Sequence, residues 1–267
     1  MTVMMKDSFK CEFIGDTTRP KILLMHGMGF WWKKCFRELI DALSDNYCII
    51  LPEAAGHHNV KEKKVHIDIT DIAANIENTL KEKEINSIDV VYGISFGATV
   101  AAELALSGNV HVGTLIVDGA QFVNMGGSGK LSAFVMAWQF MRLPKGRHMN
   151  SYVRGQLGYG DRDEVKILTP LMCDEISFSA LYRSALACYM YDISSRGDFR
   201  CDLVFMYGAD EQFAAKSEMI ARARTKGGFR TMKFRGMGHA EALSCCADEI
   251  AAAISDSAVR KHKKPVI

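Results

Sequence analysis

Residues 88–107 read Ile-Asp-Val-Val-Tyr-Gly-Ile-Ser-Phe-Gly-Ala-Thr-Val-Ala-Ala-Glu-Leu-Ala-Leu-Ser. The β-branched residues at the start are typical of a strand, and the alanine-rich residues at the end are typical of a helix. Between them lies the five-residue turn Gly93-Ile94-Ser95-Phe96-Gly97. Glycine two residues before and two after the serine lets a strand and a helix approach closely. The stretch therefore predicts a strand, a sharp turn and a helix.

The serine of this turn is a candidate nucleophile. Ser95 would stand at the carboxyl end of a strand and beside a helix N-terminus, where developing negative charge is stabilised. The same pattern also occurs in glycine-rich turns without a catalytic role. Its position between a strand and a helix favours a nucleophile, which needs a general base and an acid elsewhere in the chain.

Composition limits the class of protein. The chain has 267 residues, of which 48% are hydrophobic and 24% charged, which predicts one large α/β domain or a core domain with an insertion. A formal charge of +2 excludes the broad basic field of a nucleic-acid-binding protein. No secretion signal or run of about 18 apolar residues is visible. The eight scattered cysteines indicate reduced thiols, so we expect a cytoplasmic protein.

Apolar runs of strand length alternate with helical patterns along most of the chain. These runs span residues 21–25, 47–51, 88–92, 114–117, 203–207 and 231–234. Their hydrophobicity is nearly continuous, as expected of parallel strands that are covered on both faces. The pattern predicts an α/β fold with a doubly wound, mostly parallel sheet.

The alternation stops for about eighty residues in the middle of the chain. A crossover between parallel strands needs only about a dozen residues or somewhat more, so we expect an inserted domain here. Its apolar stretches indicate a mainly helical cap, entered through a flexible glycine-rich segment at residues 125–130. We therefore expect a core domain of residues 1–120 and 200–258, a cap of residues 121–199 and a basic tail of residues 259–267, to which we assign no function.

With the turn placed as a nucleophile elbow, the chain resembles the α/β-hydrolase superfamily. Leu23-Leu24-Met25-His26-Gly27-Met28-Gly29 is similar to the His-Gly loop of that family. The resemblance implies that the backbone N–H groups of Met28 and Phe96 form an oxyanion hole. A glycine-rich turn without this role is the alternative. Residues 51–58 are similar to a scaffold segment of the family, with Glu53 in place of its usual Asp and His58 in place of its last Gly.

The remaining members of a catalytic triad are implied by a third matching block. In related hydrolases the acid commonly lies three residues after a strand-ending glycine, and after Gly208 this position is Glu211. Asp210 is the adjacent alternative, and Asp118 is a third candidate acid. The base would be His239, at the end of a Gly-x-Gly-His segment.

The resemblance implies a serine hydrolase that acts through an acyl-enzyme without a cofactor or metal ion. We expect a small to medium apolar ester or related acyl substrate, no nucleic-acid partner and no membrane span. The oligomeric state stays open. Phe30, Trp31 and Trp138 are candidate substrate-binding residues, although packing between cap and core would also explain them. A serine nucleophile argues against dehalogenases and epoxide hydrolases of this superfamily, which use aspartate.

Alternatives on the same scaffold stay open. Thioesters, lactones and carbon–carbon bonds are cleaved by the same kind of site, and a lyase or a cofactor-free oxygenase would also use the histidine. A non-catalytic receptor would keep the triad and use the cap to bind a ligand.

Overall fold

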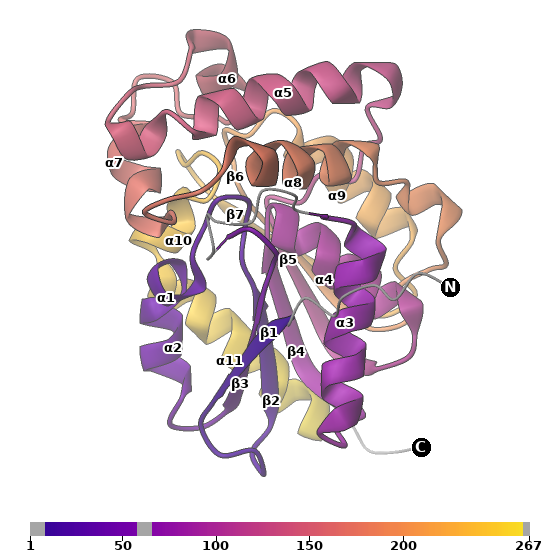
Figure 1. Cartoon of the computed structure of the whole chain (residues 1–267). Helices are drawn as coiled ribbons and strands as arrows, with labels where there is room; N and C mark the ends of the chain where they lie inside the picture. The colour runs from indigo at the N-terminus through magenta and orange to yellow at the C-terminus, as the bar shows by residue number, and fades with distance from the viewer. Residues whose placement is uncertain (1–8, 58–65, 264–267) are drawn as a thin grey trace, which may run out of the picture.

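The core is a seven-stranded sheet in the order β1-β3-β2-β4-β5-β6-β7 (Figure 1). The computed structural model describes residues 9–57 and 66–263, with the backbone alone for residues 260–263. The strands are β1 (Lys10–Ile14), β2 (Lys21–Met25), β3 (Cys48–Glu53), β4 (Ser87–Ile94), β5 (His111–Asp118), β6 (Asp202–Gly208) and β7 (Phe229–Phe234). Strands β2 to β7 pair in parallel, which confirms the predicted mostly parallel sheet.

The edge strand β1 was not predicted. It runs antiparallel to β3, and its side chains alternate between exposed and half-buried positions. A strand of five residues with only one covered face lacks the continuous apolar run that marks the central strands. The sequence therefore showed no clear signal for it.

Helices cover both faces of the sheet. Helices α3 (Ile69–Glu82) and α4 (Phe96–Ser107) pack together on one face, and α2 (Arg37–Leu43) packs with α11 (Ala247–Lys263) on the other (Figure 1). The other core helices are α1 (Trp32–Cys35), α9 (Ala214–Ala223) and α10 (Glu241–Cys245). None of the described helices combines the length and apolar character of a membrane span.

Helix α3 shows how local sequence sets an element. It begins after Asp68, whose carboxylate accepts hydrogen bonds from the N–H groups of Thr70 at 2.8 Å and Asp71 at 3.1 Å. These bonds satisfy backbone donors that have no acceptor within the helix. Its buried residues form one stripe: Ile69, Ile72, Ala73, Ile76 and Leu80.

The chain between β5 and β6 forms a mainly helical layer over the carboxyl ends of the strands, at the top of Figure 1. This layer contains α5 (Gly129–Phe140), α6 (Ser151–Gln156), α7 (Glu164–Leu168) and α8 (Phe178–Met190), with short 3-10 turns at Gly126–Ser128, Leu143–Lys145, Thr169–Leu171 and Ile193–Ser195. Helix α5 packs along α8. We call residues 121–199 the cap.

Two details of the predicted organisation differ from the structure. The entry at residues 125–130 is a 3-10 turn followed by the start of α5, and it is tied to α8 because the Met125 N–H donates to the Tyr189 carbonyl at 2.8 Å. Helix α11 continues to Lys263, beyond the expected domain end at residue 258. Residues 264–267 of the predicted tail lie outside the described residues.

The turn between β4 and α4 is set by a close approach of backbones. A Cβ atom on Gly97 would lie 2.1 Å from the Met25 carbonyl oxygen of β2, and a Cβ atom on Gly93 would lie 2.3 Å from the Gly97 carbonyl oxygen. Any side chain at these positions would push α4 away from the sheet. The two glycines of the elbow are therefore required by packing.

We expect Gly97→Ala to lower the free energy of unfolding by about 1–3 kcal/mol, because the methyl group overpacks the contact with β2. Equilibrium urea denaturation measures this change. Gly127→Ala is the matched control, since no heavy atom beyond its neighbours in the chain lies within 4 Å of its Cβ position. Equal losses in both variants would contradict the packing explanation.

Candidate active site

Ser95 is held in a strained backbone conformation at the elbow. Its φ of 55° and ψ of −117° are rare for a residue with a side chain and cost about 1–3 kcal/mol. The Ser95 N–H donates to the Asp118 carbonyl of β5 at 2.8 Å, and the Ser95 carbonyl accepts from the Ala98 N–H at 3.0 Å. These bonds hold the turn, and the Ser95 side chain lines a cavity beneath the cap.

The two predicted oxyanion-hole residues lie at the same cavity. Phe96 is the first residue of α4, where backbone N–H groups have no acceptor within the helix. Met28 lies in the loop after β2, and both residues line the cavity together with Ser95. The structure brings the three together, and the role of their N–H groups stays a prediction.

His239 and Glu211 form a buried pair. The His239 Nδ1 lies 2.8 Å from the Glu211 Oε2, and both side chains are buried. The other carboxylate oxygen of Glu211 accepts from the Gly208 N–H at 2.8 Å. An Nδ1–H that donates to the carboxylate leaves Nε2 as the acceptor nitrogen of a neutral imidazole. His239 also lines the cavity that Ser95 lines.

The other two candidate acids have different partners. Asp210 is exposed, and its carboxylate lies 3.0 Å from the Arg162 guanidinium. Asp118 is buried and accepts a hydrogen bond from the Tyr92 hydroxyl at 2.9 Å. Within the described part of the chain, Glu211 is the candidate whose carboxylate is hydrogen-bonded to His239.

Burial and nearby carboxylates shift the pKa values of His239 and Asp118. Burial lowers the pKa of His239, but the charge and hydrogen bond of Glu211 outweigh it, so the pKa is raised above its usual 6.5. Burial, followed by repulsion from Glu211, raises the pKa of Asp118 to about 6. The site therefore stabilises a positive imidazolium, which is what a general base becomes after it accepts a proton.

The cap contributes directly to the positions of the acid and the base. The Arg162 guanidinium contacts Asp210 and lies 3.1 Å from the Glu241 carboxylate, and it also donates to the Gly236 carbonyl. Asp210 precedes Glu211, and Glu241 follows His239 by two residues. Arg162 therefore joins the two loops that carry the buried pair. Sequence analysis missed this residue, since no motif connects it with either loop.

Two further contacts attach the cap to the histidine loop. The Leu157 carbonyl accepts from the His239 N–H at 2.8 Å, and the buried Tyr159 hydroxyl donates to the His239 carbonyl. Both backbone polar groups of His239 are thus bonded to the cap. Its ring orientation depends on the cap as well as on Glu211.

The cavity has a volume of about 330 Å³ and a mostly apolar lining. Its walls include Val135, Met136 and Phe140 of α5, Leu157, Ala185 and Cys188 of the rest of the cap, and Phe213 after β6. Polar groups in the lining include Gln121, Ser132, Gln156 and Ser184. The spacing of Ser132, Val135, Met136 and Phe140 places them on one face of α5, so helical periodicity was the signal available for them.

The three predicted substrate-binding aromatic residues do not line this cavity. Phe30 is buried and pairs with Met172, and the Trp31 N–H donates to the Leu171 carbonyl at 3.0 Å, so both join the core to the cap. Trp138 is exposed on α5, with the Arg142 guanidinium 4.6 Å from its ring centre. Phe30 and Trp31 therefore turn into packing between core and cap, and Trp138 faces outward, so the structure does not bring these three predicted residues to the cavity.

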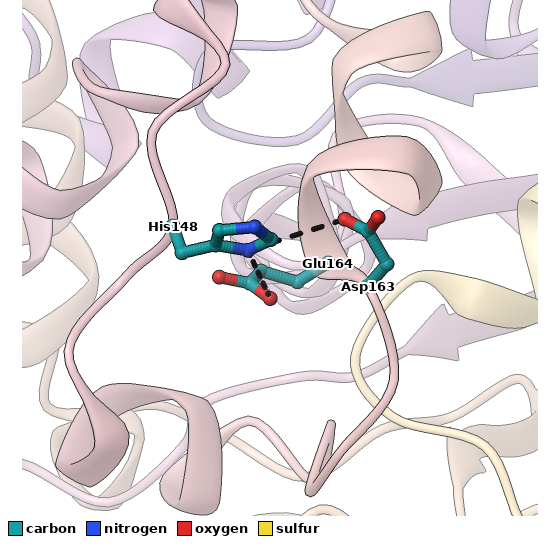
Figure 2. A group of neighbouring side chains, drawn as sticks. All are labelled: His148, Asp163 and Glu164. Atoms are coloured by element: carbon teal, nitrogen blue, oxygen red, sulfur yellow. Dashed lines mark hydrogen bonds and ion pairs between the residues drawn. The ribbon is translucent and has the colours of Figure 1, made fainter.

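A possible metal-ligand cluster lies elsewhere in the cap (Figure 2). His148, Asp163 and Glu164 place donor atoms within 4.8 Å of one another. Glu164 already contacts the Arg154 guanidinium at 3.1 Å, and Asp163 contacts the Lys166 ammonium at 3.3 Å. Two cations thus neutralise the two carboxylates, and we assign this cluster to holding the α6–α7 region together.

The chain is similar to known proteins of one family and one fold. Residues 22–253 match the model of a family described as "Alpha/beta hydrolase family". None of the curated proteins in the comparison matches the chain. Among solved structures, a protein from Desulfitobacterium hafniense assigned to the alpha/beta hydrolase family is 31% identical, with a TM-score of 0.89 over 92% of this chain and 99% of that chain.

Two more distant structures share the fold. A carboxylesterase from Nitrososphaera gargenis is 15% identical, with a TM-score of 0.72 over 96% of this chain and 95% of that chain. A thermophilic esterase from Thermogutta terrifontis is 16% identical, with a TM-score of 0.70 over 96% of this chain and 94% of that chain. At these identities the likeness concerns the fold alone.

The first prediction from the site concerns the acid. A general base must be neutral, so activity should fall as pH drops below the raised pKa of His239. Glu211→Gln removes the charge that raises this pKa. We expect the acid limb of kcat/KM to move to lower pH and kcat to fall by about 10²–10⁴-fold. Ester hydrolysis followed from acidic to neutral pH measures both effects.

Asp210→Asn is the matched control for the acid. It removes a neighbouring carboxylate that contacts Arg162 and not His239. We expect it to leave the acid limb in place and to reduce kcat much less. A larger loss in Asp210→Asn than in Glu211→Gln would contradict the assignment of the acid.

The second prediction concerns Arg162. Arg162→Ala should lower kcat by up to about 10²-fold, because displaced acid and histidine loops misplace the reacting groups. KM should change little, since Arg162 does not line the cavity. Steady-state kinetics measure the two constants separately. The control is Arg222→Ala, which removes an arginine paired with Glu218 on α9 and should leave kcat and KM unchanged. A rise in KM without a fall in kcat in Arg162→Ala would refute a positioning role.

Proposed function

Because this chain belongs to the alpha/beta hydrolase family, we propose that it is a serine hydrolase that cleaves a carboxylic ester of a small to medium apolar substrate. One observation carries this proposal. Ser95 stands on a strained turn at the same cavity as His239, whose ring is hydrogen-bonded to the buried Glu211. A nucleophile, a base and an orienting acid are the parts that acyl transfer needs.

In the proposed reaction, Ser95 attacks the ester carbonyl while His239 accepts the hydroxyl proton. Glu211 holds the imidazole in the required tautomer and stabilises its positive charge. The N–H groups of Phe96 and Met28 stabilise the oxyanion of the tetrahedral intermediate, and donors of this kind contribute about 2.7–4 kcal/mol each. His239 then gives its proton to the leaving alcohol, which leaves an acyl-enzyme.

Water completes the cycle. His239, now neutral, accepts a proton from a water molecule that attacks the acyl-enzyme carbonyl. A second tetrahedral intermediate forms at the same oxyanion hole. Collapse of this intermediate returns the proton to Ser95 and releases the carboxylic acid.

The cavity supports an apolar substrate of limited size. A volume of about 330 Å³ is near the lower end of the range of about 300–1,000 Å³ for ligand pockets. Aliphatic, aromatic and sulfur-containing side chains dominate its lining. These features fit a short to medium acyl chain better than a sugar or a peptide. All eight cysteines are free thiols, which supports a place in the reducing cytoplasm.

A series of p-nitrophenyl esters with increasing acyl length tests the proposal. We expect kcat/KM to rise with acyl length while methylenes enter the cavity and to fall once the chain exceeds it. Ser95→Ala should lower kcat by on the order of 10⁶-fold, to the background rate. A fluorophosphonate should label Ser95 in the wild-type protein and leave Ser95→Ala unlabelled.

Ser107→Ala is the matched control, because Ser107 is an exposed serine at the end of α4 that does not line the cavity. It should keep both turnover and labelling. Absence of both in the wild-type protein would contradict the serine hydrolase. Labelling of Ser95 without ester turnover would rule out the ester preference and direct the search to thioesters, lactones or a bound ligand.

A further inference from the structure

The outer side of the cap carries an apolar surface. Among the described residues, seven large hydrophobic side chains are exposed, and four of them lie on α5 and α6. These four are Leu131, Phe134, Trp138 and Tyr152, with exposed fractions of 69%, 51%, 46% and 72%. We call these four residues the cap patch. Such clustering marks interaction surfaces, whereas single exposed apolar residues are ordinary.

Helix α5 is apolar on two adjacent faces. Leu131, Phe134 and Trp138 follow one another at spacings of three and four and therefore share one face. Leu131 stands at the edge of this face and also lines the cavity, together with Val135 and Met136 on the adjacent face. The Phe134 ring also packs against Phe178 of α8 at 5.3 Å between ring centres, which continues the apolar surface onto the neighbouring helix. A helix that is apolar all round usually has both sides covered.

Positive charge accompanies the cap patch. The sequence contains no Asp or Glu between Asp118 and Asp161, and this interval holds five basic residues. They are Lys130, Arg142, Lys145, Arg147 and Arg154, of which Arg154 is paired with Glu164. Lys130 is exposed in the first turn of α5, and Lys145 and Arg147 are exposed five and seven residues after its last residue. Because the whole chain has a formal charge of only +2, this segment is distinctly more basic than the rest.

The cap patch is continuous with the cavity. Leu131 and Tyr152 are largely exposed and also line the cavity that contains Ser95. The cavity therefore reaches the surface beside apolar side chains. An apolar molecule held against the cap patch could therefore pass between Leu131 and Tyr152 into the cavity along apolar side chains.

We propose that the cap patch docks on an anionic lipid bilayer, from which apolar acyl substrates pass to Ser95. The passage to Ser95 rests on the proposed hydrolase function, whereas the docking does not. Tryptophan and tyrosine favour the boundary between headgroups and acyl chains, and leucine and phenylalanine enter the acyl region. Exposed lysine and arginine are attracted to anionic headgroups. Binding to an anionic bilayer combines insertion of apolar side chains with attraction of nearby positive charges to the headgroups.

Co-sedimentation with lipid vesicles tests the docking. The wild-type protein should bind vesicles of equal parts phosphatidylglycerol and phosphatidylcholine, and bind vesicles of phosphatidylcholine alone much more weakly. Phe134→Ser with Trp138→Ser should weaken binding by about tenfold or more, because two apolar insertions are lost. Lys145→Glu with Arg147→Glu should weaken it by about fivefold or more.

The matched control is Lys216→Glu with Met219→Ser on α9. Met219 is 71% exposed, which lies within the range of 46% to 72% of the cap patch, and Lys216 is also exposed. This variant should bind as the wild-type protein does. An equal loss of vesicle binding in the control variant would overturn the proposal. Equal binding to both kinds of vesicle, or binding to a small acidic protein and not to vesicles, would also overturn it.

Repeating the vesicle assay in Ser95→Ala separates docking from catalysis. Vesicle binding that persists in Ser95→Ala and falls in the cap-patch variants supports docking even where no ester is hydrolysed. Ester hydrolysis in solution by a protein that does not bind anionic vesicles would overturn docking and leave the hydrolase proposal intact. Circular dichroism of each variant checks that the fold is retained.

Discussion

The close contact between the N-terminus of α4 and the end of β2 is the constraint on which the site depends. Gly97 has no space for a side chain beside the Met25 carbonyl, so the chain must turn sharply between Gly93 and Gly97. Ser95 takes a strained backbone conformation as a consequence, and its hydrogen bond to the Asp118 carbonyl holds it there. The strain is sustained because strands on both sides over-determine the position of the turn.

The cap completes the site that this turn begins. Backbone groups of His239 bond to Leu157 and Tyr159, and Arg162 links the loop of the acid to the loop of the histidine. A cap that only covered the cavity would not need these contacts. The geometry of the His239–Glu211 pair is shared between core and cap, which couples any movement of the cap to the arrangement of this buried pair.

Helix α5 combines two apolar roles on adjacent faces. One face lines the cavity over Ser95, the other carries Phe134 and Trp138 outward, and Leu131 stands between them. Five basic residues and the absence of acidic residues along 119–160 distinguish this segment from the remainder of the chain, which has a formal charge of −3. One inserted segment thus supplies most of the cavity wall, the exposed cap patch and the contacts that hold the His239–Glu211 pair.

Sequence alone was sufficient for the parallel sheet and the insertion, because buried strands and amphipathic helices are local patterns. It also indicated Ser95 and His239, since both follow strands within short glycine-containing motifs. Tertiary structure decided which carboxylate meets His239: Glu211 and Asp210 are neighbours in sequence, and only the fold of the loop turns one inward and the other toward Arg162. It also moved Phe30 and Trp31 into packing and brought Arg162 to the site, because contacts between residues distant in sequence arise only when core and cap close on each other.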